Sequence, residues 1–201
     1  MFELPKSCYV NKFIPKKLFY KKVNMTTAVK KKFTSLIEKI TWLYKIAPDT
    51  LEVNKTDNIN ELEIFEIQLR QKQIPKNIIK VITKAIPYPI LFIIKYKEDY
   101  CYSIKVAENY YSNWNEELNF DFNYNNLNEI YENIVKKIIR EDTNRHSFDE
   151  IISINEKKKE LEKQIIQLRR KISQEKQFNR KVELNQELRK LEEEMEELKN
   201  E

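Results

Sequence analysis

The stretch from Glu61 to Lys97 constrains the fold more than any other part of the chain, because it is typical of a strand, a helix and a second strand in close succession. Residues 61–70 alternate between apolar and partly polar positions, as the period of a half-buried strand requires. Pro75 stands where a first helical residue belongs, and isoleucines recur at helical spacing up to Pro87. Residues 90–94 are continuously apolar, which is typical of a strand covered on both faces.

Such short connections favour a right-handed parallel crossover within one sheet. Residues 91–97 and 100–106 flank Glu98 and Asp99, and this two-residue connection indicates a β-hairpin. We therefore expect an α/β (α+β) domain over residues 1–140, with a mixed sheet built on the strand-helix-strand unit and flanked by helices.

The flanking segments are expected to cover this sheet. Residues 1–23 form a basic arm with one helical turn over residues 15–20, followed by a helix that starts near Asn24 or Thr26. The expected apolar face of that helix consists of Phe33, Leu36, Ile37, Ile40 and Leu43. We further predict a strand over residues 50–53 and a helix over residues 127–140. The aromatic segment 107–125 is either an irregular edge strand or a platform on which nucleobases stack.

Composition excludes several classes of protein. A chain of 201 residues that is 41% hydrophobic and 34% charged suits one domain with an appendage. Its longest apolar run is too short to cross a bilayer, and its start lacks the features of a signal peptide. Cys8 and Cys101 are too few for a disulfide or zinc framework, so we expect a cytoplasmic protein with reduced thiols.

The absence of glycine excludes further classes. Phosphate-binding loops and dinucleotide fingerprints need glycine for close backbone approach, so a P-loop ATPase or an ordinary Rossmann enzyme is not expected. Left-handed turn positions should fall to asparagine instead. His146 is the only histidine, which argues against a catalytic triad and against a zinc site.

Positive charge is concentrated at the amino terminus, where residues 1–45 carry 11 basic and 2 acidic side chains. A one-sided lysine cluster is typical of a nucleic-acid-binding surface, although it is equally typical of a solvated helix face. The candidate DNA-binding residues are Lys16, Lys17, Lys21, Lys22, Lys30, Lys31 and Lys32.

The end of the chain has a different pattern. Residues 141–153 are predicted to be a polar linker and residues 154–201 a coiled-coil tail. Leucines and isoleucines step by three and four residues in two runs that are out of phase across residues 173–181. The tail is therefore one long helix with a rotating apolar face, or a helical hairpin. Its narrow apolar stripe needs a partner, which is a second protein, a homodimer or the tail itself.

We predict a partner-binding site where the heptad pattern is interrupted. It comprises Phe178, Asn179, Arg180, Lys181, Leu184, Asn185, Leu188 and Leu191.

An alternative is a metal-dependent nuclease. The expected order of helix, strand, strand, helix and strand is that of the restriction-endonuclease core, in which an aspartate and a Glu-x-Lys motif bind the metal ion. Asp49, Glu66 and Gln68 would then hold Mg²⁺, with glutamine in place of the lysine. The main hypothesis has no catalytic residue, cofactor or metal.

Several segments resemble a known bacterial family. The tail residues 175–185, followed by Glu187 and Leu188, are similar to the closing signature of domain-of-unknown-function family 4391. Residues 14–20, 64–67 and 85–92 are similar to its other blocks. The resemblance implies a protein encoded beside helicases and DNA methyltransferases of restriction or phage-defence type. We therefore expect a non-catalytic adaptor that docks such a partner, or itself, through its tail.

Overall fold

The computed structural model describes residues 2–140 and 147–200. The chain divides into two compact units, Met1–Glu141 and Asp142–Glu201. Each is described by itself. Among the residues that the structure describes, no helix is both long enough and apolar enough to cross a membrane.

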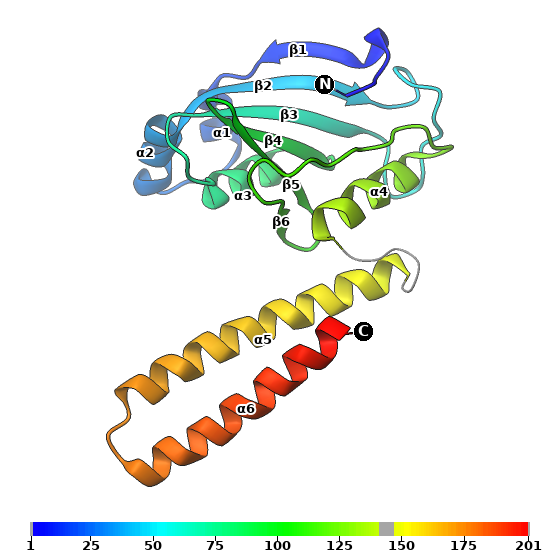
Figure 1. The fold of residues 1–201 in the computed structure, drawn as a ribbon. Helices are drawn as coiled ribbons and strands as arrows, with labels where there is room; N and C mark the ends of the chain where they lie inside the picture. The colour runs from blue at the N-terminus through cyan, green and yellow to red at the C-terminus, as the bar shows by residue number, and fades with distance from the viewer. Residues whose placement is uncertain (1, 141–146, 201) are drawn as a thin grey trace. The chain divides into compact units, whose positions relative to one another are not determined.

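The first unit is built on a six-stranded sheet whose strands lie in sequence order (Figure 1). Its strands are β1 (Tyr9–Phe13), β2 (Ile37–Ile46), β3 (Leu62–Leu69), β4 (Ile90–Tyr96), β5 (Asp99–Lys105) and β6 (Asn109–Tyr111). Neighbours are antiparallel except for β3 and β4, which are parallel and joined by helix α3 (Lys76–Ala85). The predicted α/β class, the parallel crossover and the β4–β5 hairpin are confirmed.

Three helices cover one face of this sheet. They are α1 (Lys16–Lys22), α2 (Thr27–Leu36) and α3, which gather at one side of the strands in Figure 1. Phe19 of α1, Phe33 of α2 and Ile79 of α3 join one buried cluster with Phe65 and Phe92 of the sheet. Helix α4 (Leu127–Ile139) packs against β5 and β6. The principal core therefore lies between β2–β5 and the first three helices.

The prediction of a helix continuing to Leu43 is wrong. Helix α2 ends at Leu36, and β2 begins at Ile37. Register shifts between Ile37 and Lys39, and again between Trp42 and Tyr44, interrupt the two-residue alternation of β2. The apolar residues of β2 therefore recur at a spacing that resembles a helical period, while pairing with β3 imposes the extended backbone.

Two further predictions differ from the structure near the start of the chain. Residues 50–53 form a turn, in which the Thr50 hydroxyl donates to the Lys45 carbonyl and accepts from the Ala47 amide. The predicted amino-terminal arm contains strand β1 and a short 3-10 helix (η1, Lys6–Cys8) as well as α1. Short segments with mixed polar and apolar residues become strands here because a longer neighbour supplies their hydrogen-bond partners.

The turns function without glycine by using other residues with positive φ. Asn11, Lys97, Asn115 and Arg140 adopt φ of 47°, 53°, 59° and 68°. Asparagine occupies two of these positions, as expected, because its side chain tolerates the left-handed region. Lys97 lies in the tight turn between β4 and β5, and Arg140 ends α4.

The second unit is a helical hairpin, so the folded-back alternative is the one that the structure adopts. Helix α5 (Phe148–Gln174) and helix α6 (Phe178–Asn200) lie side by side and are joined by residues 175–177 (Figure 1). Helix α5 starts at a capping box of Ser147 and Glu150, so residues 148–153 of the predicted linker are helical. The linker residues 141–146, including His146, lie outside the described residues.

One carboxyl group is buried in the sheet. Glu63 on β3 is 4% exposed, and its Oε2 has no hydrogen-bond partner among the described residues. Burial, reinforced by the neighbouring Glu61 carboxylate, raises the pKa of Glu63 to about 9. Glu63 therefore stays protonated in the folded chain at neutral pH, whereas it ionises when the chain unfolds.

We expect Glu63 to make the first unit less stable as the pH rises. A carboxyl group whose folded pKa is about 9 and whose ordinary value is 4.5 takes up a proton on folding between these pH values. Folding stability should therefore fall from about pH 5 to pH 9, and Glu63→Gln should remove about 1–3 kcal/mol of that dependence. Urea unfolding of both proteins at pH 5 and pH 8 measures the effect. Glu98→Gln, which changes an exposed carboxyl group, is the control, and parallel pH profiles for wild type and Glu63→Gln would contradict the prediction.

Candidate functional site

The three residues of the nuclease alternative are not brought together. Asp49 lies in the turn after β2, with its carboxylate 2.8 Å from the Lys45 ammonium, and this hydrogen bond lowers the pKa of Asp49. The last residue of β2, Ile46, lies opposite Leu62. Glu66 is therefore four strand positions, about 13 Å, farther along the sheet. Asp49 and Glu66 cannot bind one metal ion in this arrangement.

Glu66 and Gln68 do share one face of β3. Their neighbour on the same face is Lys95 of the parallel strand β4, whose Nζ lies 2.8 Å from the Glu66 carboxylate. Within residues 2–140 and 147–200, no group of three or more His, Cys, Asp or Glu side chains is arranged to hold a metal ion. The Glu66 region therefore presents an ion pair beside an amide.

This ion pair lies in an aromatic groove. The strand registers place Phe13, Thr41, Glu66, Ile93 and Tyr102 in one row across five strands. The next row along the strands contains Lys39, Gln68, Lys95 and Tyr100. Because alternate residues of a strand point to the same face, both rows lie opposite the face that α1, α2 and α3 cover.

A cavity of about 510 Å³ occupies this face. Its lining residues are Phe2, Tyr9, Leu43, Tyr44, Glu66, Ile93, Lys95, Tyr100 and Tyr102. A second cavity of about 410 Å³ shares Phe2, Tyr100 and Tyr102 with the first. We call these two cavities the sheet groove. Sequence reasoning identified Glu66 but missed the tyrosines, because they come from three strands and converge only when the sheet forms.

Burial and the neighbouring Tyr100 raise the pKa of Tyr102 above its ordinary value. Its hydroxyl group is therefore neutral over the physiological range and is able to donate a hydrogen bond. The groove thus combines neutral aromatic rings with three carboxylates, those of Glu3, Glu66 and Glu117, and with one ammonium group, that of Lys95.

The candidate DNA-binding lysines lie on α1 and α2. Lys16 has a structural contact, because its Nζ donates to the Ile37 carbonyl at 2.6 Å, and burial lowers the pKa of its ammonium group. The remaining side chains are exposed, and they are Lys17, Lys21, Lys22, Lys30, Lys31 and Lys32. Neither helix contains an acidic residue. These lysines form a positively charged surface that we call the basic face.

Most leucines of the predicted partner site pack within the hairpin. Leu161, Ile165 and Met195 are buried together, and Leu188, Leu191 and Leu198 pack around them. Leu184 is also buried. Arg169 and Glu192 pair across the two helices at 2.6 Å. The two helices of the tail therefore bury their apolar side chains against each other. The sequence pattern alone was equally compatible with burial against a separate partner.

The polar members of the predicted site lie at the turn of the hairpin. Phe178 is 78% exposed and Val182 is 40% exposed. Arg180 pairs with Glu183 at 2.5 Å, and Asn185 donates to the Lys181 carbonyl at 2.7 Å. We call the exposed residues 176–182 the hairpin tip. The structure thus divides the predicted site into an internal seam and an exposed tip.

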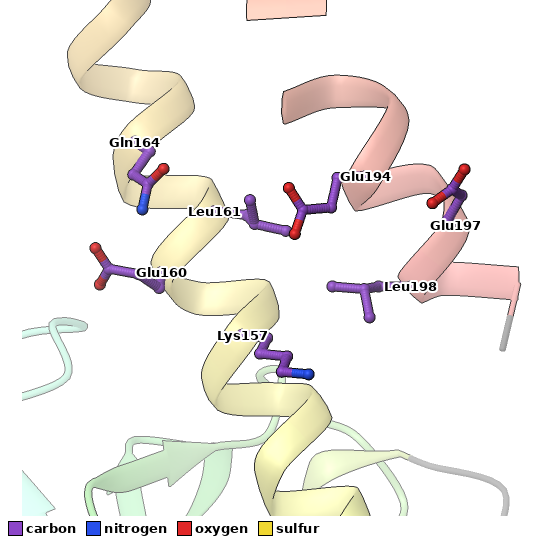
Figure 2. Close-up of a pocket in the computed structure, with 7 residues that line it drawn as sticks. All are labelled: Lys157, Glu160, Leu161, Gln164, Glu194, Glu197 and Leu198. Atoms are coloured by element: carbon purple, nitrogen blue, oxygen red, sulfur yellow. The ribbon is translucent and has the colours of Figure 1, made fainter. Parts of the chain in front are cut away.

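Figure 2 shows a pocket between α5 and α6 near the other end of the hairpin. It has a volume of about 380 Å³ and is lined by Lys157, Glu160, Leu161, Gln164, Glu194, Glu197 and Leu198. Leu161, Leu198 and Glu194 point into the space between the helices, whereas Glu160 and Glu197 point away from it (Figure 2). The floor of the pocket is apolar, and most of the charged residues at its rim are glutamates.

The chain is therefore an α/β domain joined to a helical hairpin. Residues 2–195 match the family described as a domain of unknown function (DUF4391), and the chain belongs to that family. The predicted family is thereby confirmed. No curated protein and no solved structure matches the chain.

Two adjacent isoleucines test whether the internal seam stabilises the hairpin. Ile165 is 9% exposed and Ile166 is 67% exposed. Replacing Ile165 by alanine should destabilise the hairpin by about 2 kcal/mol because it leaves a cavity, whereas Ile166→Ala should change stability by less than about 0.5 kcal/mol. Thermal unfolding followed by circular dichroism at 222 nm measures both. Equal effects of the two substitutions would show that the helices do not pair through this seam.

Proposed function

We propose that the protein is a non-catalytic adaptor of a restriction- or phage-defence-type locus, and that it associates through the hairpin tip. The observation that carries this proposal is the exposure of Phe178. Its side chain is 78% exposed, although most of the other apolar side chains of α6 pack against α5. Large aromatic side chains at the centre of exposed surfaces are frequent anchors of protein interfaces. Lys176, Arg180 and Lys181 are exposed neighbours of Phe178 along the chain, and Arg180 is paired with Glu183.

The chain itself carries a surface that complements the tip. The pocket between α5 and α6 has Leu161 and Leu198 as its apolar floor, with Glu194 beside them. The hairpin tip, residues 176–182, carries three basic and no acidic side chains, whereas the pocket is lined by three acidic side chains and one basic one. Two antiparallel hairpins would place the tip of each copy on the pocket of the other. This arrangement is two-fold symmetric and closed, so it produces a dimer rather than a filament.

The adaptor function then follows from having two α/β domains in one assembly. Such a dimer presents each sheet groove and each basic face twice. The family resemblance supports a helicase or a DNA methyltransferase as the enzyme that the adaptor serves. A protein partner of this kind would meet the α/β domains while the hairpins hold the two copies together.

We expect the full-length chain to dimerise through Phe178. Phe178→Ala should weaken dimerisation by about tenfold or more, because it removes the aromatic anchor from an interface that contains few other apolar groups. Sedimentation velocity over a range of protein concentrations measures the dissociation constant. Ile166→Ala, which removes an exposed apolar side chain elsewhere on the hairpin, is the matched control and should dimerise normally. A wild-type chain that remains monomeric at every concentration would refute the dimer.

The basic face supports a second function, which is binding to duplex DNA. Six exposed lysines on two helices without acidic residues can release counterions from phosphates. This surface lies on the first unit and does not involve the hairpin tip. The two functions are compatible, because an adaptor that binds DNA brings its enzyme to the substrate.

Replacing Lys30, Lys31 and Lys32 together by alanine should weaken DNA binding in all sequence contexts. The slope of log affinity against log salt should fall in magnitude by about 2–3, since each lysine neutralises about one phosphate. Fluorescence anisotropy with a labelled duplex at several salt concentrations measures both quantities. The charge-matched control replaces Lys163, Lys171 and Lys190, which are exposed on the hairpin outside its tip. Identical salt slopes for the two triple variants would remove the basic face from DNA binding.

A further inference from the structure

The sheet groove lies on the face of the sheet opposite α1, α2 and α3, and neither the hairpin tip nor the basic face includes it. It crosses β1 to β5 and continues to the segment after β6. Its lining combines aromatic rings with three carboxylates and one ammonium group. We propose that the sheet groove binds an extended, arginine-containing peptide segment of a partner protein.

The charge of the groove is negative. Glu66 is paired with Lys95 at 2.8 Å, so these two side chains together are neutral. Glu3 and Glu117 line the second cavity, both are exposed, and neither carboxylate is paired with a cation among the described residues. Lys39 lies on the same face but lines neither cavity. Two negative charges of the groove are therefore unbalanced, and they repel a polyanion and attract a cationic ligand.

This negative charge is a local property of one face of the sheet. The chain as a whole carries a net charge of +5, and the lysines of the basic face lie on helices that cover the other face. Phe2 of the groove also contacts Phe122, with ring centroids 5.5 Å apart. Phe122 lines a third cavity of about 540 Å³, whose charged lining residues among those described are Asp49 and Glu52. The groove therefore selects a cationic segment against the charge of the rest of the chain.

The aromatic rings of the groove favour arginine over lysine. Tyr9 contacts Tyr44 with ring centroids 5.5 Å apart, yet 52% of Tyr9 is exposed. Tyr100 contacts Tyr102 at 5.6 Å, and Tyr102 is held edge-on against Phe120 at 4.9 Å. The face of a tyrosine ring attracts a cation. A planar guanidinium group can stack on such a ring and also pair with a carboxylate through two hydrogen bonds, whereas an ammonium group has no planar surface to stack.

The length of the groove favours a peptide over a small cation. The lining residues come from five adjacent strands, which are separated by four spacings of about 4.8 Å and together span about 19 Å. An extended chain advances about 3.3 Å per residue, so about six residues cover this distance. Phe2 lines both cavities, and its ring lies 6.1 Å from Tyr44 and 5.9 Å from Phe120. The surface is therefore continuous, and a small cation would occupy only one of the two cavities.

A separate protein is a better occupant than the hairpin tip of this chain. The tip also combines an aromatic ring with basic side chains. Its residues from Phe178 onward are helical, however, so they do not lie extended along a groove. The proposed function engages the tip with the pocket of a second copy, and the choice of a separate partner rests on that proposal.

The test uses the full-length chain and a fluorescein-labelled peptide of about eight residues in which arginine alternates with serine. Fluorescence anisotropy should show saturable binding. The same peptide with lysine in place of arginine should bind about fivefold more weakly, because it loses the stacking and the paired hydrogen bonds but keeps the charge. The peptide with glutamate in place of arginine should not bind.

Substitutions at Tyr9 test the aromatic contribution. Tyr9→Leu, which keeps an apolar side chain against Tyr44 but removes the ring, should weaken binding of the arginine peptide by about fivefold. Tyr9→Phe retains the ring and should restore the affinity. Tyr88→Ala, which removes a tyrosine that is 40% exposed outside the groove, is the control and should bind as the wild type does.

The double variant Glu3→Gln with Glu117→Gln tests the charge. It should weaken binding of the arginine peptide by about fivefold, since two ion pairs are lost. The matched control is Glu162→Gln with Glu193→Gln, which removes the same charge from exposed positions on the hairpin and should bind normally. Circular dichroism verifies that each variant is folded.

Several outcomes would overturn the proposal. They are the absence of saturable binding, equal affinities for the arginine and lysine peptides, and equal affinities of the two double glutamate variants. Binding of oligothymidylate that displaces the peptide and is lost in Tyr9→Leu would make the ligand a nucleic acid. Displacement by a peptide of residues 174–185 would make the hairpin tip the occupant. Sedimentation measures dimerisation separately, so failure of the proposed dimer is distinguishable from failure of peptide binding.

Discussion

The structure of the α/β unit depends on the position of β3 between two partners. β3 is antiparallel to β2 and parallel to β4, so both of its edges are hydrogen-bonded along their length. Phe65, Ile67 and Leu69 point toward the helical layer, while Glu66 lines the sheet groove and Gln68 lies on the same face of the strand. A shift of one residue in this register would exchange the two sets. The same strand pairing therefore determines the core and places the candidate ligand-binding groups.

The two faces of the sheet have different physical characters. Under α1, α2 and α3 the side chains are almost all apolar, and the close packing of Phe33, Ile79 and Phe92 holds the helices in place. The other face has an open part lined by tyrosines that are stabilised by ring contacts with one another rather than by a covering helix. A sheet that is rigid on one side and open on the other is able to position a recognition surface without itself changing shape.

The hairpin separates stability from recognition within one short segment. Its leucines pack in the contact between α5 and α6. The Arg169–Glu192 ion pair joins the two helices at their surface. The residues at the turn take no part in that seam, so they remain accessible while the helices are stable. The predominantly basic residues 156–181 and the predominantly acidic residues 182–201 lie beside each other when the tail folds back, which favours the hairpin, and the same charges are available to a second copy. The hairpin tip and the basic face, for which function is proposed, therefore lie outside the apolar clusters of the two units.

The sequence by itself was sufficient for the elements whose patterns are local. The alternation of β3, the isoleucine spacing of α3 between two prolines, the β4–β5 hairpin and the two helical runs of the tail all follow from neighbouring residues, and the family follows from the tail motif. Tertiary structure alone determined that residues 37–43 form a strand. Register shifts interrupt the alternation of apolar and polar residues there, and pairing with β3 imposes an extended backbone on apolar residues that are spaced as in a helix. It also determined that Asp49 and Glu66 lie apart, that the seam of α5 and α6 closes on itself, and that tyrosines from β1, β2 and β5 converge beside Lys95. These features depend on contacts between residues distant along the chain, whose register is set by the sheet as a whole rather than by any local pattern.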